Sequence, residues 1–301
     1  MKMRLPLFLF LLSRAVVASA DLHVVVVEGI GGEVRYAEQF AEQVAAIADA
    51  AETMTSSDRV TLLRSDAATR DAVVEYFDQL NASVTADDRI AVYLIGHGSY
   101  DDHQYKFNLS GPDLTGEDLK EMLDANQAGT QLLVNTSSAS GALQEDMTDD
   151  RRTLILATRS GVERHATRFG GYFVAALSAG SADLDKNNIV TATEAFQFAE
   201  RQVADYYERN GQLATEHPGI DGGNATRFGL ARLGTNAPVS ADSQLRELRT
   251  ERDAINASIE DLRLRRDAMS ADEYQNELLR NMLELATLED EIEQREAQLQ
   301  E

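Results

Sequence analysis

Polar residues that could do chemistry follow two apolar stretches of this chain. One stretch, VYLIGHGS, ends with His97 between two glycines. A later one, LLVNTSSASGAL, ends in hydroxyl residues and a glycine: Thr136, Ser137, Ser138, Ser140 and Gly141. A histidine and a hydroxyl that meet in a fold are candidates for a general base and a nucleophile. The first question is therefore which elements hold these residues and whether they bring them together.

Apolar runs rich in β-branched residues recur along the chain, at 22–29, 59–66, 89–98, 130–137 and 152–161. Runs that are apolar throughout are typical of strands in a parallel sheet covered on both faces. Helical spacing fills several of the intervals, at 36–52, 69–83 and 115–127. Thr115, with two acidic residues close behind it, is a helix-capping signal. The alternation of strand and helix predicts the α/β class.

The predicted sheet places the two polar stretches at one edge. His97 ends the third run and Ser138 follows the fourth. Functional groups of open α/β sheets gather where the carboxyl ends of the strands meet. Histidine and serine are therefore expected side by side. Three charged residues follow the fifth strand and could line the pocket, but they are interpreted as surface charge: Arg159, Glu163 and Arg164.

Together the two stretches resemble the caspase-legumain clan of cysteine peptidases, especially its legumain-like branch, which includes the catalytic subunit of the GPI transamidase. In that family one apolar strand ends in His-Gly, and a later one ends in a sequence of the type Ala-Cys-x-Ser-Gly. His97 and Gly98 match the first element, and Ser138 stands where the family has its cysteine. Ser140 and Gly141 match the family's Ser-Gly.

The resemblance extends over residues 21–234 and includes the later stretches FNLSGPDLTGEDLKEMLD, LILATRSGVERHATRFGGYFVAAL and TEHPGIDG. It implies a caspase-like three-layer fold with a mainly parallel sheet between helices. It also implies that His97 and Ser138 are the positions equivalent to the catalytic pair of a peptidase.

The chain departs from this family at the nucleophile, because it contains no cysteine. A thiolate is nucleophilic near neutral pH, whereas a serine must lose its proton to a base during attack. The missing thiol favours an inactive pseudopeptidase that serves as a binding or scaffold module for a peptide or protein. A second hypothesis is a serine-type hydrolase, in which His97 activates Ser138 and the backbone N–H groups of Gly98 and Ser138 form the oxyanion hole. A third is that both stretches are ordinary turns at strand ends.

A separate motif resembles a calcium-binding loop of the EF-hand type. The ligand positions of such a loop fall on Asp183, Asp185, Asn187, Ile189 (through its carbonyl), Thr191 and Glu194. Asn188 replaces the usual glycine at the sixth position, and asparagine adopts the left-handed conformation more readily than most residues. Calcium is the one cofactor that the sequence predicts. The alternative is a turn rich in Asp and Asn that caps the following helix.

The two ends of the chain have compositions of their own. Residues 1–20 have a basic start, an apolar centre and a small-x-small end, which predicts a secretory signal peptide. The protein is thus expected to be exported, periplasmic or secreted.

Five Asn-x-Ser/Thr triplets, the acceptor motif for N-glycosylation, are interpreted as chance, because the one at Asn135 ends an apolar strand where a glycan would not fit. The source is therefore expected to be bacterial. A net charge of −23 argues against nucleic acid as a partner.

Residues 235–240 are predicted to be a linker, and residues 241–301 a helical hairpin of coiled-coil type. Four polar residues fall on its apolar seam: Arg252, Arg266, Asn281 and Arg295. The hairpin is therefore expected either to seek a partner helix or a second copy, making this an oligomerisation or docking protein, or to fold back on its own domain. No segment after residue 20 is long and apolar enough to span a membrane.

Overall fold

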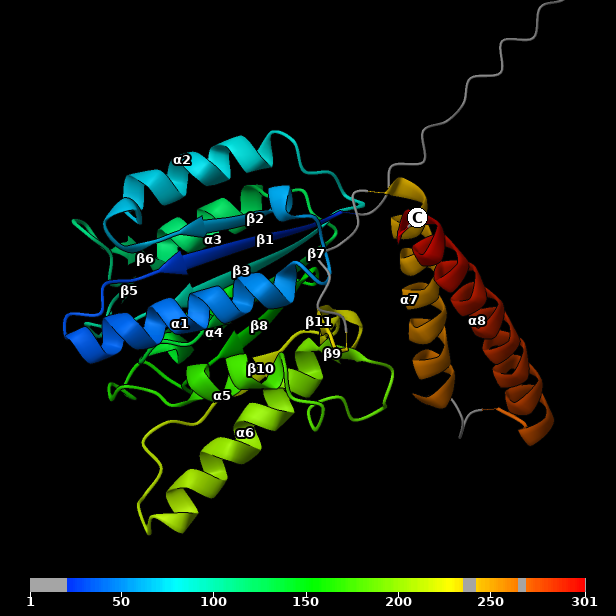
Figure 1. The fold of residues 1–301 in the computed structure, drawn as a ribbon. Coiled ribbons are helices and arrows are strands. Elements are labelled where there is room, and N and C mark those ends of the chain that lie inside the picture. The colour runs from blue at the N-terminus through cyan, green and yellow to red at the C-terminus, as the bar shows by residue number, and fades with distance from the viewer. Residues whose placement is uncertain (1–20, 235–241, 265–268, 301) are drawn as a thin grey trace, which may run out of the picture.

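The computed structural model describes residues 21–234, 242–264 and 269–300. The predicted signal peptide and linker lie outside these ranges. Figure 1 shows an α/β domain and, to one side of it, a pair of long helices. The predicted α/β class is confirmed, with a sheet between two layers of helices. No helix of the described residues combines the length and the apolar character needed to cross a membrane.

The main sheet has six strands in the order β10-β8-β7-β3-β1-β2. Five are parallel and β10, at the edge, is antiparallel to β8. The strands span β1 (Leu22–Glu28), β2 (Val60–Leu63), β3 (Arg89–Ile95), β7 (Thr130–Asn135), β8 (Arg152–Leu156) and β10 (Gly219–Asp221). All five predicted apolar runs therefore contain strands. The antiparallel β10 was not predicted, because its three residues are too few to form a recognisable apolar run.

Alternate side chains of the central strands point into two separate cores. Val24 and Val26 of β1 pack beneath one helix layer, and Val25 and Val27 pack beneath the other. The first layer consists of α1 (Val34–Ala51), α5 (Phe169–Ala176) and α6 (Ala192–Arg209). The second consists of α2 (Arg70–Asn81), α3 (Gly116–Ala125) and the short α4 (Gln144–Met147). Because both faces are covered, the strands are apolar throughout, as the sequence shows.

Smaller elements complete the fold. Two antiparallel sheets are formed by β4 (Gly98–Tyr100), β5 (Tyr105–Phe107) and β6 (Leu114–Thr115), and by β9 (Ile189–Thr191) with β11 (Gly229–Arg232). The two C-terminal helices are α7 (Ser243–Leu264) and α8 (Ala271–Gln300), which run side by side in opposite directions (Figure 1). They share a core of their own, with Ile255, Ile259, Leu288 and Ile292 among its buried residues.

The capping signal at Thr115 belongs to an ion pair that joins α2 to α3. Thr115 and Asp118 form a capping box, and Arg70 of α2 donates two hydrogen bonds to the Asp118 carboxylate, at 2.8 and 2.6 Å. These bonds hold the pKa of Asp118 at about 2, below its ordinary 3.8. The carboxylate thus contributes stability that is present above pH 3.8 and is lost as the pH falls toward 2.

Asp118→Asn should therefore lower the free energy of unfolding at pH 7 by about 1–2 kcal/mol, a value kept modest because Arg70 is partly exposed. The difference from the wild type should shrink as the pH falls through the range between the two pKa values. Chemical denaturation at a series of pH values measures it, with Asp71→Asn as the matched control on α2. If the difference in unfolding free energy between the variant and the wild type stayed constant with pH, the ion pair with Arg70 would not be the cause of the low pKa of Asp118.

Candidate functional site

The fold brings His97 and Ser138 to one edge of the sheet, as predicted. They follow β3 and β7, which are adjacent and parallel from Arg89↔Thr130 to Leu94↔Asn135. Both line a hollow of about 20 Å³, together with Tyr36, Phe40 and Thr136. This volume is enough to hold a water molecule.

The hydroxyls of the opening stretch differ in what they bind. Ser138 Oγ donates to the carbonyl oxygen of Gly98 at 3.0 Å, and Ser138 is only 6% exposed. Ser137 is fully buried and bonds Tyr105 and Asn135. Of the serines, only Ser138 lines the hollow beside His97. No hydrogen bond joins Ser138 to His97 in the described part of the chain.

The imidazole of His97 packs against aromatic rings. Its centroid lies 4.6 Å from that of Tyr36 and 5.1 Å from that of Phe40, both edge-on. Both aromatic residues belong to α1, which the sequence did not connect with the site. Among the described residues, no carboxylate binds the ring of His97, so the third group that orients a catalytic histidine has no counterpart here.

Gly98 contacts Ser138 through its carbonyl oxygen. Its N–H was expected to help form an oxyanion hole, but its carbonyl oxygen is the atom that faces Ser138 Oγ.

The turn after Ser138 is held in a strained conformation. Ala139 has φ 58°, in the left-handed region that is unfavourable for a residue with a Cβ atom. Its N–H donates to the carbonyl oxygen of Glu163 at 2.8 Å. Next to it, the N–H of Gly141 donates to Thr158 Oγ1 at 2.9 Å. The turn is thus fixed from outside by the segment that follows β8.

Glu163, interpreted from the sequence as surface charge, is a largely buried residue that joins two loops. Its carboxylate accepts hydrogen bonds from the N–H groups of Arg159 and His217, each at 3.0 Å. His217 Nδ1 lies 2.6 Å from the same carboxylate. Glu216, the residue before His217, accepts hydrogen bonds from the N–H groups at the start of α5, and burial raises its pKa. The stretch TEHPGIDG therefore binds the segment after β8 and the start of α5 and does not line the small hollow between His97 and Ser138.

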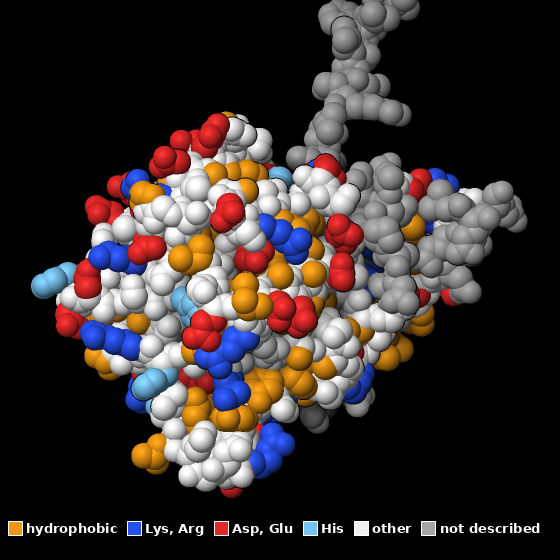
Figure 2. Space-filling model, turned by 60° about the vertical axis from the view of Figure 1, so that its left-hand side comes forward, with side chains coloured by type: hydrophobic (Ala, Val, Ile, Leu, Met, Phe, Trp, Pro, Cys, Tyr) orange, Lys and Arg blue, Asp and Glu red, His pale blue; other side chains and the backbone are white. Residues whose placement is uncertain are grey.

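Two larger hollows flank the small one. The first, of about 570 Å³, shares Tyr36, Gln39, Ala166 and Thr167 with it and is also lined by two arginines, Arg35 and Arg168. The second, of about 510 Å³, lies on the other side of the Ser138 turn and is lined by the acidic residues Glu145 and Asp221. Figure 2 shows the molecule turned toward this edge, where arginine and lysine side chains alternate with acidic and apolar ones.

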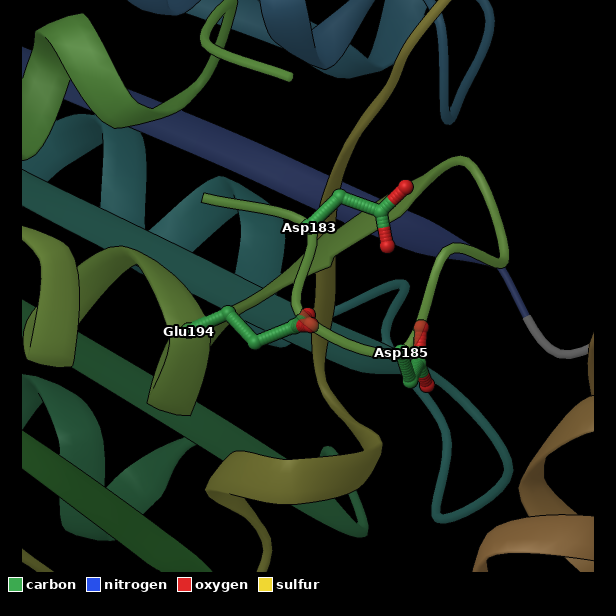
Figure 3. A group of neighbouring side chains, drawn as sticks. All are labelled: Asp183, Asp185 and Glu194. Atoms are coloured by element: carbon green, nitrogen blue, oxygen red, sulfur yellow. The ribbon is translucent and has the colours of Figure 1, made fainter. Parts of the chain in front are cut away.

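The predicted calcium loop forms a second candidate site, between α5 and α6. Oxygen atoms of Asp183, Asp185 and Glu194 all lie within 4.8 Å of one another (Figure 3). These are three of the six predicted ligands. Among the described residues, this is the one group of acidic, histidine or cysteine side chains that converges in this way.

The backbone of the loop is wound around the first carboxylate. Asp183 accepts hydrogen bonds from the N–H groups of Asn187 and Asn188, both at 3.1 Å. Asn188 has φ 65°, the left-handed conformation that a glycine usually provides at this position. Ile189 opens strand β9, which pairs with β11 and not with a second calcium loop.

The remaining predicted ligands make hydrogen bonds within the loop. Asn187 Oδ1 accepts from the N–H of Ile189, and the hydroxyl of Thr191 caps α6 by accepting from the N–H of Glu194. Glu194 in turn accepts from the N–H groups of Leu184 and Thr191. The donor set is all oxygen and carries three carboxylates, which suits calcium. The capping role, the alternative for this loop, is present as well.

Comparisons with known proteins place few limits on these sites. No protein-family model matches the chain. No curated protein is significantly similar to it. Among solved structures, the chain is similar to protein GSU0716 from Geobacter sulfurreducens, with a TM-score of 0.47 and 14% sequence identity, over 71% of this chain and 98% of that one. The function must therefore be argued from the geometry of the sites.

Proposed function

We propose that this chain is a caspase-like and legumain-like pseudopeptidase, exported from the cell, that binds a peptide or protein segment at the carboxyl edge of its sheet without cleaving it. The observation that carries the proposal is the hydrogen bond from Ser138 Oγ to the carbonyl oxygen of Gly98. A serine nucleophile needs its proton directed toward a base. Here the proton points to a backbone carbonyl. Export rests on the composition of residues 1–20 alone.

The surroundings of His97 support the same conclusion. The aromatic rings of Tyr36 and Phe40 contact the imidazole, where a catalytic pair would place an orienting carboxylate. The hollow between His97 and Ser138 is also small, at about 20 Å³.

Purified wild-type protein should therefore show no hydrolysis of peptide or ester substrates above the level of Ser138→Ala. The competing serine-hydrolase hypothesis predicts turnover that falls at least about a thousandfold in both Ser138→Ala and His97→Ala. A fluorogenic peptide series and a nitrophenyl ester series measure both variants alongside the wild type. Turnover lost in both variants would overturn the proposal, whereas turnover kept in either one would reveal a contaminant or another site.

Replacement by cysteine tests the scaffold separately. Ser138→Cys restores the nucleophile of the family but not an orienting group for His97. We expect the thiol of this variant to remain inactive toward the same substrates. Cleavage by Ser138→Cys would mean that the pocket is competent and that the nucleophile alone is missing.

The bound segment should carry an acidic side chain. The hollow that adjoins the Ser138 site is large enough for a side chain and is lined by Arg35 and Arg168. Because the chain as a whole is strongly acidic, a hollow lined by two arginines is unusual on it. Arg168 lies over the ring of Tyr206 and Arg35 pairs with Glu33, so an acidic side chain placed there would be attracted chiefly to the guanidinium of Arg168.

Fluorescence anisotropy with labelled peptides tests this binding. A peptide with a central aspartate should bind more tightly than the same peptide with asparagine, and Arg168→Gln should remove the difference. Arg201→Gln, at an exposed position on α6, is the matched control. Equal binding of the two peptides by the wild type would contradict an acidic ligand.

We propose calcium binding as a second function, favoured by the left-handed Asn188 and the three converging carboxylates. At about 1 mM calcium the melting temperature should rise by a few degrees, since an ion that binds only the folded state stabilises it. Asp183→Asn should abolish that rise, whereas Glu200→Gln, an exposed residue of α6, should keep it. Titration calorimetry with calcium measures the same site directly. An unchanged wild-type melting curve with and without calcium would leave only the capping role.

A further inference from the structure

The C-terminal hairpin has two apolar faces, of which only one is covered. Toward α7, helix α8 presents the buried Leu288 and Ile292. Elsewhere on α8, Leu279 is 59%, Met282 55% and Leu283 61% exposed. Positions separated by three and four residues lie on one face of a helix, so these three form a continuous stripe. We call them the α8 stripe.

The stripe is not a missing part of the hairpin's own interface. The polar residues on the seam between α7 and α8 find partners inside the hairpin. Asn281 donates to Ser258 Oγ at 3.2 Å, and Arg295 binds both oxygens of Asp242, at 3.1 and 2.6 Å. Arg266, also predicted on the seam, lies outside the described residues. The polar seam residues in the described part of the hairpin therefore have partners within this chain. A partner protein would bind a face of α8 other than the one that packs against α7.

Charge selects the partner that fits the stripe. Helix α8 contains nine acidic residues and only two arginines. One of those arginines, Arg295, pairs with Asp242. The exposed acidic residues Glu284 and Asp290 lie in and beyond the turn that holds the stripe, where the other arginine, Arg280, is also exposed. Glu289 pairs with the seam residue Arg252 of α7 at 3.8 Å. A second copy of α8 laid on the stripe would face acid with acid, and an anionic lipid surface would be repelled for the same reason.

We infer that the α8 stripe is the docking surface for a basic amphipathic helix of another protein. Its apolar residues cover Leu279, Met282 and Leu283, while its lysines or arginines lie against the acidic residues of α8. The mode is that of a helix laid against an apolar face. Because the stripe is short, the complex buries a small area and is transient rather than permanent. This inference is independent of the pseudopeptidase site and of the calcium loop.

A designed peptide tests the inference on the full chain. The probe is a labelled helix of about 18 residues, with leucines at helical spacing and lysines elsewhere. It should bind the wild type with an affinity that weakens as salt is added. The double variant Leu279→Gln, Leu283→Gln should lose at least about tenfold in affinity. Leu213→Gln, which removes a leucine that is 91% exposed in the loop between α6 and β10, is the matched control and should bind as the wild type does.

Three outcomes would overturn the inference. A scrambled peptide of the same composition that binds equally well would show that charge alone attracts the probe. Undiminished binding by the double variant would place the probe elsewhere on the chain. A wild-type mass of two copies in solution that falls to one copy in the double variant would show that a second copy covers the stripe. Circular dichroism of the double variant should match the wild type, since the stripe makes no buried contact.

Discussion

Replacing Gly141 by alanine should lower the free energy of unfolding by about 3 kcal/mol and the melting temperature by about 10 °C. A Cβ atom at this position would lie 2.2 Å from the backbone carbonyl carbon of Arg159 and 2.2 Å from the backbone nitrogen of Ser160. Both clashes are with backbone, which cannot rotate away as a side chain can. To accommodate the methyl group of alanine, the turn at Ser138 and the segment after β8 must move apart.

Gly180→Ala is the matched control, because a Cβ atom there would meet nothing within 4 Å. It should change stability by no more than about 0.5 kcal/mol. Thermal and chemical denaturation of both variants measure the difference. If Gly141→Ala unfolded like Gly180→Ala, the close approach of these two segments would be wrong, and with it the support of Ser138 by the segment after β8.

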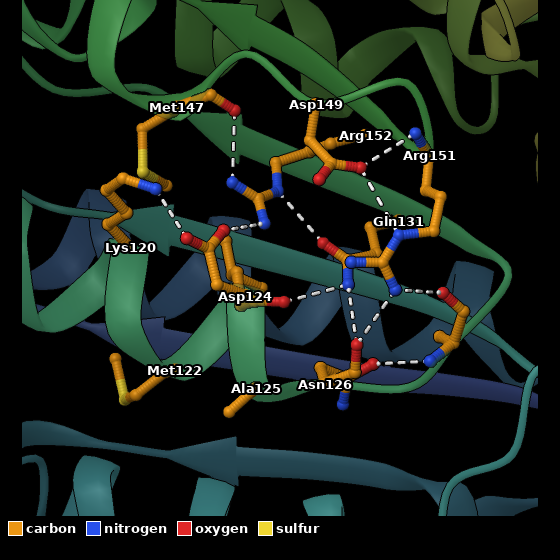
Figure 4. A network of polar contacts seen from close by, with 12 residues as sticks. Lys120, Met122, Asp124, Ala125, Asn126, Gln131, Met147, Asp149, Arg151 and Arg152 are labelled. Atoms are coloured by element: carbon orange, nitrogen blue, oxygen red, sulfur yellow. Dashed lines mark hydrogen bonds and ion pairs between the residues drawn. The ribbon is translucent and has the colours of Figure 1, made fainter.

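A second large effect is expected in the buried polar network between β7 and β8 (Figure 4). Arg152 is buried and donates to Gln131 Oε1 at 2.9 Å, to the carbonyl oxygen of Met147 at 3.0 Å and to Asp124 at 2.9 Å. Gln131 also donates to the carbonyl oxygens of Leu123 and Asn126. One amide side chain thus satisfies a buried cation and two backbone acceptors.

Gln131→Met should cost about 3 kcal/mol, because it keeps the volume but leaves the buried Nε of Arg152 without an acceptor and removes one donor from each of two carbonyl oxygens. Adding Arg152→Met should cost less than the sum of the two single changes, since the buried N–H group that lost its acceptor is then gone. Gln127→Met, at an exposed position in the loop before β7, is the control and should be close to neutral. A double-mutant cycle by chemical denaturation measures the coupling. Additive effects would mean that the two side chains do not depend on each other.

The sequence predicted the layers and the meeting of His97 with Ser138, because both follow from apolar runs and from the shared edge of parallel strands. It did not predict what each group binds. The hydrogen bond from Ser138 to Gly98 depends on β4, which begins at Gly98 and is too short to leave a periodic pattern. The aromatic contacts of His97 come from Tyr36 and Phe40 of α1. The helical spacing of that segment predicts a helix but does not connect it with His97.

Glu163 shows why charge is hard to interpret from sequence alone. A glutamate in a loop is usually exposed, and nothing in its neighbourhood marks it as buried. Its burial follows from the return of the chain at His217, far along the sequence. The partner of Arg295 in the hairpin was equally hard to predict, because Asp242 lies 53 residues away in the sequence, just before the start of α7.

The bond between Ser138 and Gly98 has a consequence for how relatives of this chain should be compared. It ties the end of β7 to the start of β4, so it contributes to stability whether or not any reaction takes place. A thiol is a weaker donor and would hold this tie less well. Natural selection for folding would then retain the serine for its hydroxyl. An invariant serine at this position across homologues would be evidence of a structural constraint, and would not by itself mark a nucleophile.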